Sequence, residues 1–197
     1  MRKRNILLFG ISNVGKTTVG IHLAQRLGYA VFDLDDEVKK YYMTTLEAFV
    51  NSDIRHAREK KRGQVIREII SKPEDKVFAI SPIYYAANFN KYVLRPDVLA
   101  IELQDSPENI FQRLVFNDEN DVIYKDDEYK NQHITHYLSD IKKDITFYKR
   151  SFSKITNKFD MNNDPVELVV DRIIKVYQLA DRANMSESVI IKNLKRT

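Results

Sequence analysis

One short stretch near the start of the chain has the residue types and the spacing of a phosphate-binding loop. It follows the apolar run at residues 6–9 and reads Gly10-Ile11-Ser12-Asn13-Val14-Gly15-Lys16-Thr17, which matches the pattern G-x-x-x-x-G-K-[ST]. The glycines allow backbone N–H groups to turn toward phosphate oxygens. Lys16 would place a positive charge on the β- and γ-phosphates, and the Thr17 hydroxyl would bind Mg²⁺. The sequence therefore predicts a nucleoside triphosphate site.

The segments on either side of this loop have the order that such a site requires. Residues 5–9 predict a buried strand, and residues 17–27 predict a helix whose positive N-terminal end faces the bound anion. Gly28 is expected to end that helix. The residues expected to bind the nucleotide here are Gly10, Ser12, Asn13, Val14, Gly15, Lys16, Thr17 and Thr18.

A pair of acidic residues follows the short predicted strand at residues 30–32. At the carboxyl end of a parallel strand, Asp33 and Asp35 would face the phosphate loop. Because side chains alternate along a strand, we expect both carboxylates to point to the same side. One can hold Mg²⁺ through water, and the other can orient a substrate hydroxyl or accept its proton. The alternative is that Asp35 or Asp36 only caps the next helix and that Asp33 is a solvated strand end.

The rest of the chain alternates predicted strands and helices. Further strands are expected at residues 76–80, 98–103 and 158–161, and helices at residues 35–42, 45–50, 52–70, 106–116 and after Pro165. Ser52 and Asp53 are expected to cap the long helix, and Asp164 the last one. With right-handed crossovers, this order predicts a three-layer α/β/α fold of the P-loop NTPase type around a central parallel sheet of about five strands.

We expect a single domain at residues 1–180, with a lid at about residues 116–130. The tail at residues 181–197 is either one more helix or loosely attached.

Composition excludes several classes of function. The 197 residues include no cysteine, which excludes disulfides, thiol catalysis and cysteine-based zinc sites. No apolar run is long enough to cross a bilayer, and the first strand begins too early to leave room for a signal peptide, so we expect a cytoplasmic protein. The net charge of +4 is spread along the chain, so we do not expect nucleic acid as a partner. We expect a monomer or a weak dimer.

The stretch at residues 5–20, together with Leu23, Ala24, Leu27 and the sequence Phe32-Asp33-Leu34-Asp35, resembles the opening of shikimate kinase. That family consists of small P-loop kinases related in fold to nucleoside monophosphate kinases. The resemblance is clear over about the first 40 residues and weak to about residue 115.

The resemblance implies ATP and Mg²⁺ as cofactors and Lys16 and Asp35 as catalytic residues. It places Asp33, with Thr17, at the metal, and Asp35 at the acceptor hydroxyls. It also implies that Arg55 or Arg58 on the long helix grips the carboxylate of the acceptor. Arg113 is the remaining candidate for a phosphate-contacting arginine, the alternative being a solvated helix residue.

Two stretches depart from the family. Where the family has a triple glycine after the third strand, this chain reads Ile80-Ser81-Pro82-Ile83-Tyr84-Tyr85, and residues 117–128 of the expected lid carry six acids and one lysine. Such a lid would repel a triphosphate. We therefore expect ATP-dependent phosphoryl transfer to a hydroxyl of a small-molecule acceptor that need not be shikimate.

Two alternatives remain open at this point. One is a catalytically reduced nucleotide-binding protein that acts as a sensor or a partner subunit. The other is a nucleoside or nucleotide kinase, since Tyr84, Tyr85, Phe89 and Tyr92 can stack on a base. A cavity lined by Asp35 and a helix arginine supports an enzyme, whereas a cavity filled by Tyr84 or Tyr85 supports the binding protein.

Overall fold

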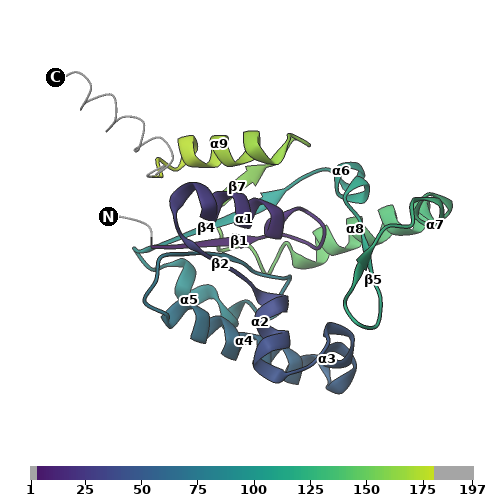
Figure 1. Cartoon of the computed structure of the whole chain (residues 1–197), viewed down its shortest axis with the longest axis horizontal. Helices are drawn as coiled ribbons and strands as arrows, with labels where there is room; N and C mark the ends of the chain where they lie inside the picture. Colours follow the sequence, from purple (N-terminus) through teal and green to yellow (C-terminus); the bar gives the residue numbers. More distant parts are fainter. Residues whose placement is uncertain (1–3, 180–197) are drawn as a thin grey trace, which may run out of the picture.

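The computed structural model describes residues 4–179, and these residues contain a five-stranded parallel sheet (Figure 1). Its strands are β1 (Asn5–Phe9), β2 (Ala30–Asp33), β3 (Lys76–Ala79), β4 (Val98–Gln104) and β7 (Asn157–Asp160). They lie in the order β2-β3-β1-β4-β7, so that β1 pairs with β3 on one side and with β4 on the other. The predicted three-layer fold is confirmed.

Helices cover both faces of this sheet. Figure 1 shows α1 (Lys16–Leu27) and α9 (Val166–Val176) on one face, and α2 (Leu34–Tyr42), α4 (Arg55–Ser71) and α5 (Asn90–Val93) on the other. The remaining helices of the described chain are α3 (Leu46–Ser52), the 3₁₀ turn η1 (Ala86–Asn88), α6 (Pro107–Gln112), α7 (Asp127–Gln132) and α8 (Ile134–Tyr148). A separate antiparallel hairpin pairs β5 (Phe116–Asn117) with β6 (Ile123–Tyr124).

Two apolar cores hold the layers together, one on each face of the sheet. Ile6 and Leu8 of β1 pack into the core that includes α1 and α9, whereas Leu7 and Phe9 pack into the core that includes α2 and α4. All five residues of β1 are buried, because a central parallel strand is covered on both faces, and the four residues after Asn5 are apolar. This burial fixes the point at which the phosphate loop begins.

Gly28 ends α1 in the left-handed conformation (φ 66°) and α9 begins after Pro165, both as predicted. The predicted start of α4 and the predicted capping residues of α4 and α9 are wrong. Ser52 ends α3, and α4 begins after Ile54, whose side chain caps nothing and is 75% exposed. Asp164 does not cap α9. It forms an ion pair with Arg172 two turns into that helix, and Pro165 stands at the cap position.

The predicted helix at residues 106–116 is too long. The helix α6 ends at Gln112, and Phe116 begins the hairpin instead. The predicted tail at residues 181–197 lies outside the described residues, and the domain limits stay a prediction. None of the helices between residues 4 and 179 combines the length and the apolar character that a bilayer crossing needs.

Two glycines give a matched test of how the phosphate loop is seated. Gly10 has φ 140°, and a Cβ there would lie 2.6 Å from the backbone oxygen of Leu103, so Gly10→Ala should lower the free energy of unfolding by about 2 kcal/mol or more. Gly20 lies inside α1, and a Cβ there would meet only ordinary contacts, the nearest 3.6 Å away. Gly20→Ala should therefore raise stability by about 0.5–1 kcal/mol. Urea unfolding of both variants measures this, and equal effects would contradict it.

Candidate active site

The phosphate loop has the backbone conformation that an anion site needs. Gly10, Asn13 and Gly15 have φ values of 140°, 60° and 111°, in the region that favours glycine and tolerates asparagine. Such left-handed positions within a turn direct successive N–H groups toward one concave side. Gly15 is also the residue from which α1 begins, and Thr18 lies exposed in the first turn of that helix.

Lys16 is buried inside the loop. Its Nζ donates a 2.8 Å hydrogen bond to the backbone oxygen of Ile11. Burial lowers the pKa of Lys16 to about 8, and the negative charges of Asp35 and Asp33 offset part of that shift. Close to neutral pH the side chain therefore keeps its charge, which is what a bound phosphate requires.

Thr17 and Asp33 meet across the edge of the loop. The Thr17 hydroxyl donates a 2.6 Å hydrogen bond to one oxygen of Asp33, and the other oxygen accepts a 2.9 Å bond from the backbone N–H of Asp35. Asp33 therefore also caps the N-terminus of α2. Burial raises its pKa, which indicates a carboxylate that a nearby cation would stabilise. Hydroxyl and carboxylate oxygens are ligands that Mg²⁺ accepts.

Asp35 reaches the same side as Asp33 by a route other than strand alternation. The strand ends at Asp33, and Asp35 lies in the first turn of α2, so the period-two argument does not apply. Both carboxylates nevertheless border one cavity of about 540 Å³. Its lining comprises Ser12, Asn13, Lys16, Thr17, Asp33, Asp35, Asp36, Lys39, Leu46, Ser81, Pro82, Val115, Phe116, Asn117, Asp121 and Ile123.

The arginine beside Asp35 is Arg62, which the sequence analysis missed. An Nη atom of Arg62 lies 3.6 Å from Asp35 Oδ1, and the other Nη lies 3.7 Å from Glu59. The sequence did hold one indication that Arg62 forms an ion pair, because Glu59 and Arg62 lie three residues apart on one helix.

The two predicted arginines are engaged elsewhere. The guanidinium of Arg58 donates to the backbone oxygens of Val50 and Asp53 at the end of α3. The guanidinium of Arg55 lies 5.9 Å from the ring centroid of Tyr84 and 5.8 Å from that of Phe147. Neither borders the cavity, so the structure brings neither to Asp35. Their role at the acceptor stays a prediction.

The stretch after β3 contributes polar and rigid groups to the cavity. Ser81 and Pro82 border it, and the buried Ser81 hydroxyl has no hydrogen-bond partner. The next residues turn away. The ring of Tyr84 stacks on Phe147 with centroids 5.0 Å apart, and the ring of Tyr85 packs edge-on against His56. The tyrosines therefore do not fill the cavity.

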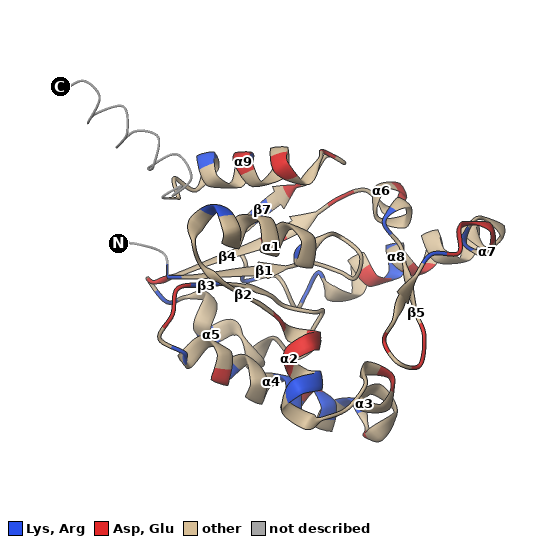
Figure 2. Ribbon diagram, in the orientation of Figure 1, with Lys and Arg blue, Asp and Glu red and all other residues tan. Residues whose placement is uncertain are grey.

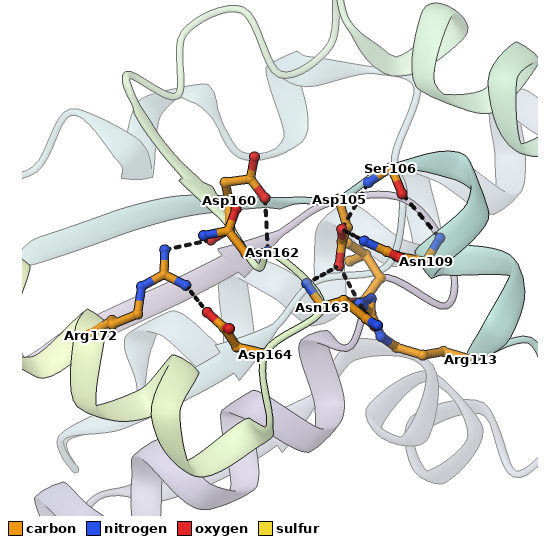
Figure 3. Close-up of polar contacts among 10 residues, drawn as sticks. Asp105, Ser106, Asn109, Arg113, Asp160, Asn162, Asn163, Asp164 and Arg172 are labelled. Carbon is orange, nitrogen blue, oxygen red and sulfur yellow. Dashed lines mark hydrogen bonds and ion pairs between the residues drawn. The ribbon is translucent and has the colours of Figure 1, made fainter.

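Arg113 lies on the other side of the phosphate loop, at the end of α6. Its guanidinium is 3.3 Å from the backbone oxygen of Val14 and forms an ion pair with Asp105. Figure 3 shows the Asp105 carboxylate surrounded by donors from Ser106, Asn109, Asn163 and Arg113. This network joins the segments that follow β4 and β7 to the phosphate loop.

The acidic hairpin is docked rather than free. Asp121 at its tip accepts a 2.9 Å hydrogen bond from the backbone N–H of Leu46 at the start of α3, and lies 3.8 Å from Lys39. Asp118 accepts bonds from two backbone N–H groups of the hairpin turn, and Asp126 caps α7. Figure 2 shows acidic residues in red along the loop of the hairpin beside α3 and at α7. Much of the acidic character thus serves local structure.

The family model for shikimate kinase matches residues 12–178 of this chain. The chain belongs to the shikimate kinase family. A shikimate kinase of Caldicellulosiruptor saccharolyticus is 27% identical over 178 residues, covering 88% of this chain and 95% of the relative.

Solved shikimate kinase structures have the same fold. That of Bacteroides thetaiotaomicron has a TM-score of 0.71 at 15% identity and covers 89% of this chain and 98% of its own. That of Acinetobacter baumannii, in complex with shikimate, has a TM-score of 0.65 at 22% identity, with coverages of 88% and 92%.

Membership of the shikimate kinase family confirms the predicted activity class. The protein is a P-loop kinase that transfers a phosphoryl group from ATP to a hydroxyl of a small molecule, with Mg²⁺ as cofactor. The roles of individual residues, including Lys16, Asp35 and Arg113, stay predictions, and the contacts described above say which atoms each role would involve.

The buried Lys16 makes nucleotide affinity depend on pH. Below its pKa of about 8 the free protein carries the charged side chain, and above it a proton must be taken up before phosphate can bind. The dissociation constant of Mg-ADP should therefore rise by about tenfold between about pH 7 and pH 9. Calorimetric titration measures this. Lys16→Ala is the control and should remove most of the pH dependence; a slope unchanged in that variant would contradict the assignment.

The Asp105 network supports the nucleotide side of the loop. The side chain of Asp105 is 2% exposed, so Asp105→Ala should remove the carboxylate that pairs with the Arg113 guanidinium and accepts from three amide donors, and should lower the free energy of unfolding by about 2–3 kcal/mol. Asp164→Ala is a matched control, since the Asp164–Arg172 pair is more exposed and should contribute less than about 1 kcal/mol. Urea unfolding measures the loss of stability in each variant. An equal loss in both would contradict the expectation that the buried Asp105 contributes more than the more exposed Asp164.

Proposed function

We propose that this kinase transfers the γ-phosphoryl group of ATP to a hydroxyl held against Asp35. One observation carries the proposal. Asp35 Oδ1 and Ser81 Oγ are buried without a hydrogen-bond partner, and their residues border the same cavity as Lys16 and Thr17. The Arg62 ion pair to Asp35 Oδ1, at 3.6 Å, is too long for a hydrogen bond. A buried polar atom without a hydrogen bond costs about 1–3 kcal/mol, so the arrangement fits a ligand that brings hydroxyl groups.

The phosphate side of the cavity has a role for each loop residue. Lys16 exchanges its bond to the Ile11 oxygen for a bond to phosphate, and the loop N–H groups bind the remaining phosphate oxygens. Thr17 and Asp33 would hold Mg²⁺, since their oxygens lie 2.6 Å apart and burial makes the Asp33 carboxylate favour a cation. When bound, Mg²⁺ neutralises part of the phosphate charge.

On the acceptor side, Asp35 orients the hydroxyl and takes its proton as the bond to phosphorus forms. Arg62, 3.6 Å away, holds the Asp35 carboxylate in place as a positioning residue. Arg113 lies beside the opposite side of the loop, where it is placed to contact the nucleotide rather than the acceptor. Little covalent chemistry is required of the protein, because alignment and charge stabilisation dominate this reaction.

The position of the tyrosines favours an enzyme over a binding protein without chemistry. Tyr84 and Tyr85 stack on Phe147 and His56 outside the cavity, so they leave its acceptor side open. No observation favours a nucleoside acceptor, because Phe89 and Tyr92 are buried in the apolar core. The cytoplasmic location and the monomeric or weakly dimeric state stay predictions.

The first experiment is ADP release by the purified protein with Mg-ATP, with and without shikimate, with Lys16→Ala as the blank. Acceptor-dependent release that disappears in the blank would support the proposal for shikimate. Without a shikimate response, a panel of polyols and nucleosides follows under the same blank. Release that is equal in the blank, or no acceptor-dependent release with any compound, would count against a working kinase.

Asp35→Asn separates the acceptor side from the nucleotide side. The substitution keeps the size of the side chain but removes its basicity, so kcat for the accepted compound should fall by about 10²–10⁴-fold. Binding of Mg-ADP should stay within about twofold of the wild type. Glu37→Gln on the same helix is the matched control, because Glu37 pairs with Lys40 outside this cavity, and its kcat should not change. A kcat preserved in Asp35→Asn would exclude Asp35 as the catalytic base.

A further inference from the structure

The cations around Asp35 are already matched or exceeded by carboxylates. Among the described residues that border the cavity, two are cationic, Lys16 and Lys39, whereas four are acidic, namely Asp33, Asp35, Asp36 and Asp121. Lys16 belongs to the phosphate loop and is needed there. The acceptor side of the cavity is therefore rich in negative charge before any acceptor binds.

Lys39 is held by two carboxylates. Its Nζ lies 3.0 Å from Asp36 and 3.8 Å from Asp121 at the tip of the docked hairpin. The carboxylate of an acceptor would be the third negative charge around this one ammonium. Displacing Asp121 would also separate the hairpin from α3, since the same carboxylate oxygen accepts the bond from the Leu46 N–H.

Arg62 is in the same position on the other side of Asp35. Its two Nη atoms face Asp35 at 3.6 Å and Glu59 at 3.7 Å, and Glu59 is buried, with an exposed fraction of 6% for its side chain. Glu59 is fixed by a further bond from the backbone N–H of Tyr85. Two carboxylates against one guanidinium leave a net negative charge at the place where an acceptor carboxylate would have to bind.

Other cations of this region have partners of their own. Arg58 is bound to the end of α3, and Arg55 lies over the rings of Tyr84 and Phe147. Lys143 on α8 pairs with Asp140 at 2.8 Å. Of the described side chains named here, none is left to neutralise an acceptor carboxylate beside Asp35.

The polar atoms that lack partners fit a different kind of group. Asp35 Oδ1 can only accept a hydrogen bond, and Ser81 Oγ can donate or accept one. A hydroxyl does both, so two hydroxyls of one ligand can satisfy both atoms. We propose that the acceptor of this site is an uncharged polyhydroxy compound rather than a carboxylate. This inference rests on the proposed function, because it describes the acceptor of that same site.

Shikimate and its methyl ester form a matched pair of probes, because they share the ring hydroxyls and differ in the carboxylate. Binding to the full chain, with and without Mg-ADP, is measured by calorimetry and does not depend on turnover. We expect the ester to bind at least as tightly as shikimate. Shikimate bound about tenfold or more tightly than its ester would overturn the inference.

Glu59→Gln provides the reverse test. The amide oxygen can still accept from Tyr85, but Arg62 loses one of its two negative neighbours, so shikimate should bind about tenfold more tightly while the ester is unchanged. Glu68→Gln, on the exposed side of the same helix, changes the net charge equally and should have no effect. Asp36→Asn is a second variant at an exposed position and should act similarly by freeing Lys39.

These variants also decide the case in which neither probe binds the wild type. Shikimate binding that appears in Glu59→Gln or Asp36→Asn, but not in Glu68→Gln, would support the inference. Its absence from both variants would overturn it. Failure of the kinase proposal is distinguishable, because it would appear as ADP release that does not depend on Lys16 or on any acceptor, whatever the order of affinities.

Discussion

The pairing of β1 with β3 on one side and β4 on the other is the constraint on which the rest of the structure depends. It buries all five residues of β1 between two apolar cores and so fixes where the chain must leave the sheet. The phosphate loop leaves at that point, with Gly10 seated against the backbone of Leu103 at the end of β4. Parallel pairing brings the end of β2, two strands away, to the same edge of the sheet.

The acceptor side is assembled from segments far apart in the sequence. The first turn of α2 supplies Asp35, the middle of α4 supplies Arg62, the segment after β3 supplies Ser81, and the hairpin supplies Asp121. None of these four segments is adjacent to another in the sequence, and the sheet brings them together in space. The charge balance of the cavity is thus a property of the fold and not of any one motif.

Much of the fold could be predicted from the sequence, because buried parallel strands are apolar runs and the phosphate loop has a strict spacing. The candidate site was harder to predict from the sequence. The helix α4 has lysines and arginines at residues 55, 58, 60, 61, 62 and 67, and only its packing decides that Arg62 faces Asp35. Strands of two residues, as in the hairpin, leave no periodic pattern to read. Ile54 at the start of α4 shows that a helix can begin without the capping residues expected of it.

The bond between Lys16 and the oxygen of Ile11 has a consequence for how the loop meets its ligand. The ammonium group closes the loop on itself, so the loop keeps its shape without a bound phosphate. An arriving phosphate replaces one hydrogen-bond acceptor with another, and few backbone or side-chain torsions have to be frozen at that moment. The conformational entropy of ordering the loop is therefore lost during folding, and association with the nucleotide does not have to supply it again.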